Sequence, residues 1–392
     1  MKPVTRLFLI ATGWTLASYM ASSFIGAWFW DIGTGLTAII TFYAVLFAVM
    51  IAAFGMASRI RGRMSSPRLM AWGIVMNVLY LGLLLGLKTK ARDYYIPLAL
   101  LEGLSASFYW LALFVLAASW VETGQAAWYN AWTGTLEAVL GLVIPPLSGW
   151  LIASVPGISG YRIVFALALA SLLGSLSLII GGKKPPDKIS PTSERALPPV
   201  IPGWRRLLWS FWALGMRDGM YFFVPNLLLY IVTRSTLVLG LFVAAQAALE
   251  GLVFWGLTRW SSARLMSLGL ATVVSALAVG IAAQPLTGVT IFVLGIVVGV
   301  AYPPYKVALE SAALADINQY SRHEGDRIQL TGIKEVWINT GRLMGLALLL
   351  GVLAVFPRFP LVDIRWILGG WVIWPIVIWW SYRNFARQST AV

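Results

Sequence analysis

The feature that most constrains this chain is a series of apolar stretches, each roughly 20 residues long, that recurs along its whole length. A helix of that length and composition spans the hydrocarbon core of a bilayer. The runs are uniformly apolar rather than alternating, which excludes a membrane β-barrel. We therefore predict an all-α membrane protein with transmembrane helices at 6–30, 34–58, 68–88, 96–120, 128–153, 160–182, 206–232, 235–258, 265–284, 287–309, 328–356 and 364–383.

The composition fits a chain whose surface faces lipid. Hydrophobic residues make up 59% of the sequence and charged residues 11%, whereas soluble globular proteins carry about 25% charged residues. The net charge of +14 is spread over short loops between the apolar stretches, not gathered on one face of a polar domain. We therefore expect the chain to lie in the lipid bilayer and not to bind nucleic acid.

The distribution of Lys and Arg predicts the orientation. Most of them lie in segments on the same side of the predicted spans as the N-terminus, including 59–68 and 183–206. Cytoplasmic loops of membrane proteins carry an excess of these residues. We expect a multi-pass protein of the plasma (inner) membrane with both termini in the cytoplasm.

The sequence repeats itself at half its own length. RMSSPRLMAWG at 63–73 returns as RWSSARLMSLG at 259–269, and a polar, Pro-rich linker separates six predicted spans from six. Further matches in the same order are Gly55 with Gly251, Gly103 with Gly299, Tyr109 with Tyr305, and Thr133-Gly134-x-x-Glu137 with Thr331-Gly332-x-x-Glu335. We predict two six-helix bundles, 1–182 and 206–392, joined by a cytoplasmic linker at 183–205.

Two parallel six-helix halves joined by such a linker resemble the major facilitator superfamily, and the resemblance covers the whole chain. It implies twelve helices in two pseudo-symmetric bundles, with a solute site between the halves. After the second helix, Gly55, Gly62 and Arg63 match the family's turn, whereas Arg59 stands where the family has an acidic residue. Arg259 is the repeat equivalent of Arg63, and we expect these residues to act in gating.

The fifth span carries a second resemblance. Gly141-x-x-x-Pro145-Pro146-x-x-Gly149 resembles the antiporter motif of exporters, which has Gly in place of Pro145 and of Trp150. The resemblance implies proton-coupled export. The alternative is a helix that Pro bends and that small residues pack closely against a neighbour.

Ionisable residues inside the predicted spans are candidates for a functional site, because charges are costly in lipid. The candidates for substrate binding and proton coupling are Asp218, Glu335, Glu102, Glu137, Arg217, Lys334 and Arg342, and the polar neighbours on the same helix faces are Tyr109, Tyr221, Asn226 and Asn339. These stripes either line an aqueous cavity or lock helices together through ion pairs. Glu250 and Lys306 lie near span ends, where their side chains are expected to reach the membrane surface.

The predicted spans, the repeat and the buried charges together indicate a transport function. We predict a monomeric secondary transporter that moves a small, amphipathic solute by alternating access, with proton-coupled export, because a buried carboxylate can bind and release a proton. A lipid or glycolipid flippase and an importer of small organic anions are the alternatives within transport. A membrane enzyme or sensor is the alternative of another class. The chain has no cysteine and one histidine, His323, in a polar stretch, so we expect neither a cofactor, nor a metal site, nor catalysis.

Overall fold

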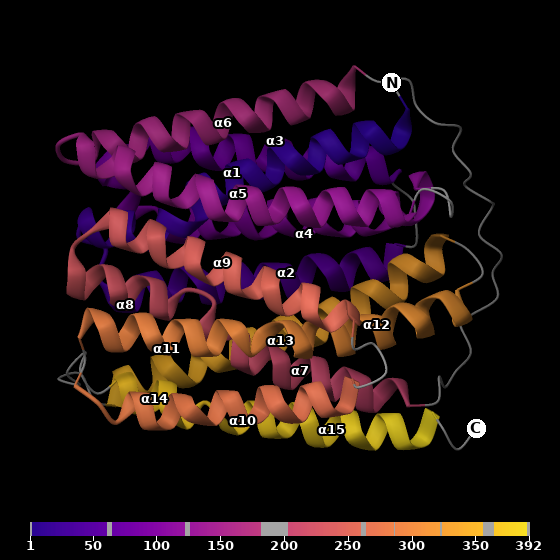
Figure 1. Ribbon diagram of the computed structural model, residues 1–392. Helices are drawn as coiled ribbons and strands as arrows, with labels where there is room; N and C mark the ends of the chain where they lie inside the picture. The colour runs from indigo at the N-terminus through magenta and orange to yellow at the C-terminus, as the bar shows by residue number, and fades with distance from the viewer. Residues whose placement is uncertain are drawn as a thin grey trace. The chain divides into compact units, whose positions relative to one another are not determined.

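The computed structural model describes residues 2–60, 65–121, 126–181, 203–259, 264–285, 287–321, 324–355 and 364–389, which are almost entirely α-helical (Figure 1). The chain divides into two compact units. Unit 1 comprises Met1–Glu194, Ser235–Ala244 and His323–Gly332. Unit 2 comprises Arg195–Arg234, Ala245–Arg322 and Ile333–Val392.

Long helices form most of unit 1. They are α1 (Pro3–Asp31), α2 (Leu36–Ile60), α3 (Ser66–Leu87), α4 (Tyr95–Trp120), α5 (Ala126–Ser154) and α6 (Ser159–Ile180), with the short 3-10 helix η1 (Lys88–Asp93) between α3 and α4. Helix α1 packs along α6, and Arg6 donates hydrogen bonds to the carbonyl oxygens of Leu178 and Ile179 at the end of α6. A cation is favoured at that position because it meets unpaired carbonyl groups.

Shorter helices are frequent in the second half of the chain. They are α7 (Trp204–Tyr221), α8 (Val224–Thr233), α9 (Thr236–Arg259), α10 (Arg264–Ala282), α11 (Gly288–Val300), α12 (Tyr302–Tyr320), α13 (Glu324–Val355), α14 (Ile364–Gly370) and α15 (Ile373–Ser389). The beginnings of α9 and α13 belong to unit 1, and the other residues of this half that the structure describes belong to unit 2.

The prediction of a multi-pass helical membrane protein is confirmed. Within the described ranges, nine helical segments are long and apolar enough to cross a membrane, and the shorter Met266–Ala282 is also apolar. Every predicted span overlaps a helix. Twelve crossings remain a prediction, since some of these helices are short or less apolar.

Three of the predicted spans are broken into two helices each. The range 206–232 contains the break between α7 and α8, 287–309 the break between α11 and α12, and 364–383 the break between α14 and α15. Pro225 and the pair Pro303 and Pro304 stand in the first turns of α8 and α12. Proline lacks an N–H and clashes with the preceding turn, so a new helix starts there.

Close helix contacts follow the internal repeat. A Cβ atom added to Gly103 in α4 would lie 2.8 Å from the carbonyl oxygen of Leu46 in α2. The repeat equivalent, Gly299 in α11, faces α9, where an added Cβ would lie 3.4 Å from the side chains of Gln246 and Glu250. Both glycines thus face the helix that the repeat assigns to them.

Gly73 provides a test of helix packing in unit 1. A Cβ atom at this position of α3 would lie 2.6 Å from the backbone nitrogen of Tyr109 in α4. We expect Gly73→Val to destabilise the protein by about 1–3 kcal/mol, because an overpacked contact forces the backbone to shift. Gly82→Val on the same helix is the control, because no described atom lies within 4 Å of its added Cβ. Equal unfolding temperatures in detergent for the two variants would contradict this packing.

Candidate transport site at the helix breaks

A buried arginine lies where two of the helix breaks meet. Arg217 in α7 is only 3% exposed, and its Nη2 donates a hydrogen bond of 2.5 Å to the carbonyl oxygen of Val298. Val298 lies in the last turn of α11, where the helix ends and α12 starts with prolines. The guanidinium therefore stabilises the end of a broken helix.

Three aromatic rings surround the same guanidinium. The carbon Cζ of Arg217 lies 5.4 Å from the ring centre of Tyr221, 5.3 Å from that of Tyr302 and 5.7 Å from that of Tyr305. The Tyr305 hydroxyl in turn lies 3.3 Å from Thr272 Oγ1 on α10. Ring faces attract cations, and the attraction is stronger where water is excluded.

The third break is linked to the other two through α7. The Tyr221 hydroxyl donates a 2.7 Å hydrogen bond to the carbonyl oxygen of Leu368 in α14. Trp371, between α14 and α15, donates from Nε1 to the carbonyl oxygen of Met216 at 2.6 Å. Residues 216–221 stand just before the α7–α8 break, and they contact both of the other interrupted spans of unit 2.

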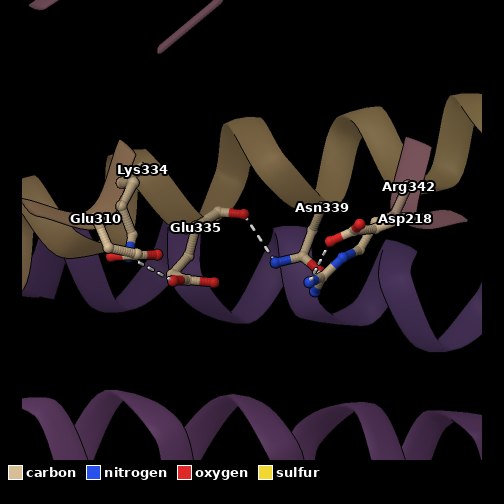
Figure 2. A network of polar contacts seen from close by, with 6 residues as sticks. All are labelled: Asp218, Glu310, Lys334, Glu335, Asn339 and Arg342. Carbon is tan, nitrogen blue, oxygen red and sulfur yellow. Dashed lines mark hydrogen bonds and ion pairs between the residues drawn. The ribbon is translucent and has the colours of Figure 1, made fainter. Parts of the chain in front are cut away.

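A chain of polar contacts runs from this point along α13 (Figure 2). Asp218 pairs with Arg217 at 3.0 Å through Oδ1 and with Arg342 at 3.6 Å through Oδ2. Arg342 donates to Asn339 Oδ1 at 3.2 Å, and Asn339 donates to the backbone oxygen of Glu335 at 2.8 Å. The predicted stripe of Glu335, Asn339 and Arg342 is thus one connected group of side chains.

Two carboxylates share one buried ammonium at the other end of this chain of contacts. Lys334 Nζ lies 2.8 and 2.9 Å from the two oxygens of Glu310 and 3.1 Å from Glu335 Oε1. Glu310 was not among the residues predicted from sequence, because the predicted span ended at residue 309. Its spacing of four from Lys306, which puts both on one face of α12, was the signal that could have identified it.

Small residues place Asp218 beside Arg342. A Cβ atom on Gly215 or Gly219 of α7 would overlap the backbone of α13 at Ile338 and Arg342, and one on Gly341 would overlap α7 at Trp212. Small residues at such contacts let membrane helices approach closely. The α7–α13 contact therefore depends on glycine at both helices.

A separate polar group lies in unit 1. Asn77 donates from Nδ2 to Glu102 Oε2 at 2.9 Å and to Ser105 Oγ at 3.0 Å. Among the described residues, no Lys or Arg lies within ion-pair distance of Glu102. Tyr109, predicted to line a cavity, is 1% exposed and stacks on Trp14 with ring centres 3.7 Å apart.

The motif of the fifth span packs against the beginning of α9, inside unit 1. Helix α5 continues through Pro145 and Pro146. Thr236 Oγ1 donates to the backbone oxygen of Gly149 at 2.8 Å, and a Cβ atom on Gly240 would overlap the backbone of Pro145. Gly141 is buried in the same helix, whereas Glu137 is exposed.

The remaining candidates lie apart from these groups. Gly55 accepts a hydrogen bond from Ser58 Oγ at 2.8 Å. Gly62 and Arg63 lie outside the described residues, and α9 ends at Arg259, whose side chain is not described. Asn226 follows the break in α8 and is partly exposed.

Glu250 and Lys306 lie close to the helix breaks. The side chain of Glu250 lies against Gly299, next to the break between α11 and α12. Lys306 Nζ lies 5.9 Å from the ring centres of both Phe254 and Tyr302. Lys306 is exposed, and that its side chain reaches the membrane surface stays a prediction.

An apolar groove of about 330 Å³ is lined by residues of α7 and α13. Its lining residues are Trp209, Trp212, Val336, Trp337, Thr340 and Met344. Trp209 forms edge contacts with both Trp212 and Trp337. This groove can accept an acyl chain or the apolar part of an amphipathic molecule.

The part of the chain that the structure describes contains no group of three or more His, Cys, Asp or Glu side chains that could hold a metal ion. The carboxylates of Asp218, Glu310 and Glu335 each contact an ammonium or a guanidinium group. A metal ion at this network would therefore have to displace a positively charged side chain.

Comparison with known proteins gives distant relatives in sequence. No protein-family profile matches the chain. "Uncharacterized protein YqgE" of Bacillus subtilis (strain 168) is 22% identical over 356 residues, which cover 89% of this chain and 83% of that protein. "Uncharacterized protein in sodM 3'region" of Geobacillus stearothermophilus is 25% identical over 179 residues, which cover 44% of this chain and 80% of that protein.

Comparison of structures gives clear similarity over whole chains. A bacterial homologue of the iron transporter ferroportin in an inward-facing state has a TM-score of 0.71 at 13% identity and covers 98% of each chain. A bacterial ferroportin homologue in an outward-facing state with soaked iron has a TM-score of 0.67 at 15% identity, covering 98% of this chain and 100% of that one. A bacterial metal transporter has a TM-score of 0.63 at 16% identity, covering 98% and 99%. The chain thus shares the fold of these proteins, and the predicted all-α class is confirmed.

Removing the charge of Asp218 tests the buried network. We expect Asp218→Asn to lower the free energy of unfolding by about 3–5 kcal/mol, because it leaves buried guanidinium charge without its carboxylate partner. Asp93→Asn is the matched control, since Asp93 pairs with Arg92 at 3.6 Å on the surface, where both side chains are more than half exposed. We expect that control to change stability by less than about 1 kcal/mol. Similar losses in the two variants, measured by unfolding in mixed detergents, would contradict the assignment.

Proposed function

We propose that this chain is a secondary active transporter that moves a small solute across the membrane by alternating access. The observation that carries the proposal is that one turn of α7, with the buried, ion-paired Arg217, is hydrogen-bonded to two other interrupted spans. Interrupted helices at membrane depth are tolerated where the backbone lines a cavity or is buried in protein. In many transporters they form the site of the solute or the coupling ion.

Proton coupling is the second part of the proposal, and Glu102 is the carboxylate that supports it best. Asp218 is held between two guanidinium groups, and Glu310 and Glu335 share Lys334. Those ion pairs have the geometry of helix locks. Glu102 has an amide donor, Asn77, in place of a cation, so binding a proton would remove an uncompensated charge from a partly buried site.

The direction that we propose is export of a solute with an apolar part. The fifth-span motif, Gly141 to Gly149, resembles that of exporters, and it forms a close small-residue contact with α9. The groove lined by Trp209, Trp212 and Trp337 offers an apolar surface beside the polar network. The motif supports export, and the groove supports a solute with an apolar part.

A metal ion is the second candidate cargo. It is favoured by the structural similarity to bacterial ferroportin homologues and to a bacterial metal transporter. In this chain, backbone oxygens at the helix breaks would have to supplement the few carboxylates available there. A transport assay with both kinds of solute separates the two candidates.

The transport proposal is tested with purified protein in liposomes that contain a pH-sensitive dye. The panel comprises aromatic organic cations, small organic anions, and the chlorides of Mn²⁺ and Fe²⁺. We expect an organic solute to move against its own gradient when an opposing proton gradient is imposed, with matching proton flux. Movement of Mn²⁺ or Fe²⁺ alone would favour the second candidate, and no movement of any member beyond that of empty liposomes would contradict both.

Replacing Glu102 tests the coupling. We expect Glu102→Gln to abolish solute movement driven by a proton gradient, because the amide keeps the shape of the side chain but cannot take up a proton. Exchange of solute for solute at equal pH should continue, since it needs no net proton movement. Asp31→Asn in the same unit is the control, because Asp31 is exposed and accepts a hydrogen bond from the Tyr161 hydroxyl. Normal proton-driven transport by Glu102→Gln would show that the proton is carried elsewhere.

A further inference from the structure

The surroundings of Arg217 have the chemistry of a receptor for an organic cation. The guanidinium is held by the carbonyl oxygen of Val298 at 2.5 Å and by Asp218 Oδ1 at 3.0 Å. The rings of Tyr221, Tyr302 and Tyr305 lie 5.3 to 5.7 Å from its central carbon. Aromatic cages with a carboxylate nearby are the usual way in which proteins bind guanidinium and quaternary ammonium groups.

Most parts of this receptor come from elements other than the Arg217 side chain itself. The carbonyl oxygen belongs to the last turn of α11, and two of the rings belong to the first turn of α12. The side chains of Gln246 and Glu250 lie against the neighbouring Gly299. Free carbonyl groups, carboxylates and ring faces all carry negative potential, so the place attracts a positive group whether or not the arginine fills it.

The side chain of Arg217 fits this receptor incompletely. Its Nη1 and Nη2 are hydrogen-bonded, but the buried Nε has no hydrogen-bond partner among the described residues. An unpaired buried donor is unfavourable. A free guanidinium is not restrained by a connection to α7, so it can reorient to bond the same carbonyl and carboxylate, whereas a quaternary ammonium has no N–H donor to leave unpaired.

We propose that this place recognises the cationic group of the transported solute, a guanidinium or a quaternary ammonium, and that Arg217 occupies it when no solute is bound. The identification of the ligand as cargo rests on the proposed function. A monovalent cation gives the receptor the same compensating charge that Arg217 gives it. An anionic solute would instead meet Asp218, the α11 carbonyl groups and three ring faces, all of which repel it.

The test empties the receptor and refills it. Arg217→Ala is purified in detergent, and its unfolding temperature is measured against increasing methylguanidinium chloride, tetramethylammonium chloride and MnCl₂. We expect methylguanidinium or tetramethylammonium to raise the unfolding temperature saturably, with at least tenfold higher apparent affinity than for the wild-type protein. Arg206→Ala on the same helix is the control, because Arg206 is exposed and its side chain donates to the backbone oxygen of Asn384 at 3.2 Å; it should not respond.

A second variant keeps the test decisive if Arg217→Ala is not recovered folded. Arg217→Lys retains a charge but removes the planar fork, and the same titrations apply to it. Recovery of Arg217→Ala only in the presence of methylguanidinium also supports the receptor. Adding Asp218→Asn to either variant should abolish the response.

The proposal is overturned if neither variant responds to, or is recovered by, either organic cation. A response to MnCl₂ alone overturns it in favour of a metal ion. These measurements need no membrane, so they are independent of the transport assay. Binding by the variants without uptake of any solute into liposomes would retain a cation receptor and contradict the proposed function.

Discussion

The buried guanidinium of Arg217 is the interaction on which the organisation of unit 2 depends. It joins the end of α11 to α7, it is covered by tyrosines from α7 and α12, and it pairs with Asp218. An interrupted helix in an apolar protein leaves carbonyl and N–H groups without partners, and these groups must be satisfied within the protein. One long, multiply donating side chain satisfies the break between α11 and α12, and it links that break to the other two through its own helix.

Pairing of opposite charges explains how unit 2 can hold so many ionisable groups. Asp218 lies between Arg217 and Arg342, and Lys334 lies between Glu310 and Glu335, with Asn339 connecting the two clusters along α13. Ion pairs of this kind are expensive to form and more expensive to break. They hold α7, α12 and α13 in fixed register. The carboxyl of Glu102 in unit 1 contrasts with this arrangement, because it accepts a hydrogen bond from Asn77 and has no ion pair with any residue that the structure describes.

Much of the fold could be predicted from sequence, since apolar length and the repeat act over long stretches of chain. The spans, the all-α class and the correspondence between Gly103 and its repeat equivalent Gly299 all depend on such patterns. The breaks could not be predicted in the same way, because the ranges around Pro225, Pro303 and Gly370 are as apolar as their neighbours. The contacts of Arg217 with a backbone oxygen and three tyrosine rings were also not predicted, because the spacing of charged residues carries no information about such contacts. Glu310 was missed because a span boundary fell one residue before it.

The central claim is that the three breaks form one unit held by Arg217, and hydrogen exchange followed by mass spectrometry tests it most directly. The protein in lipid nanodiscs is compared with Arg217→Lys, and the peptides of interest cover 216–224, 297–304 and 367–373. The account predicts that amide exchange rises in all three peptides together, while peptides from α1 to α6 exchange as in the wild-type protein. A rise confined to the α7 peptide, with the other two breaks unchanged, would contradict the claim.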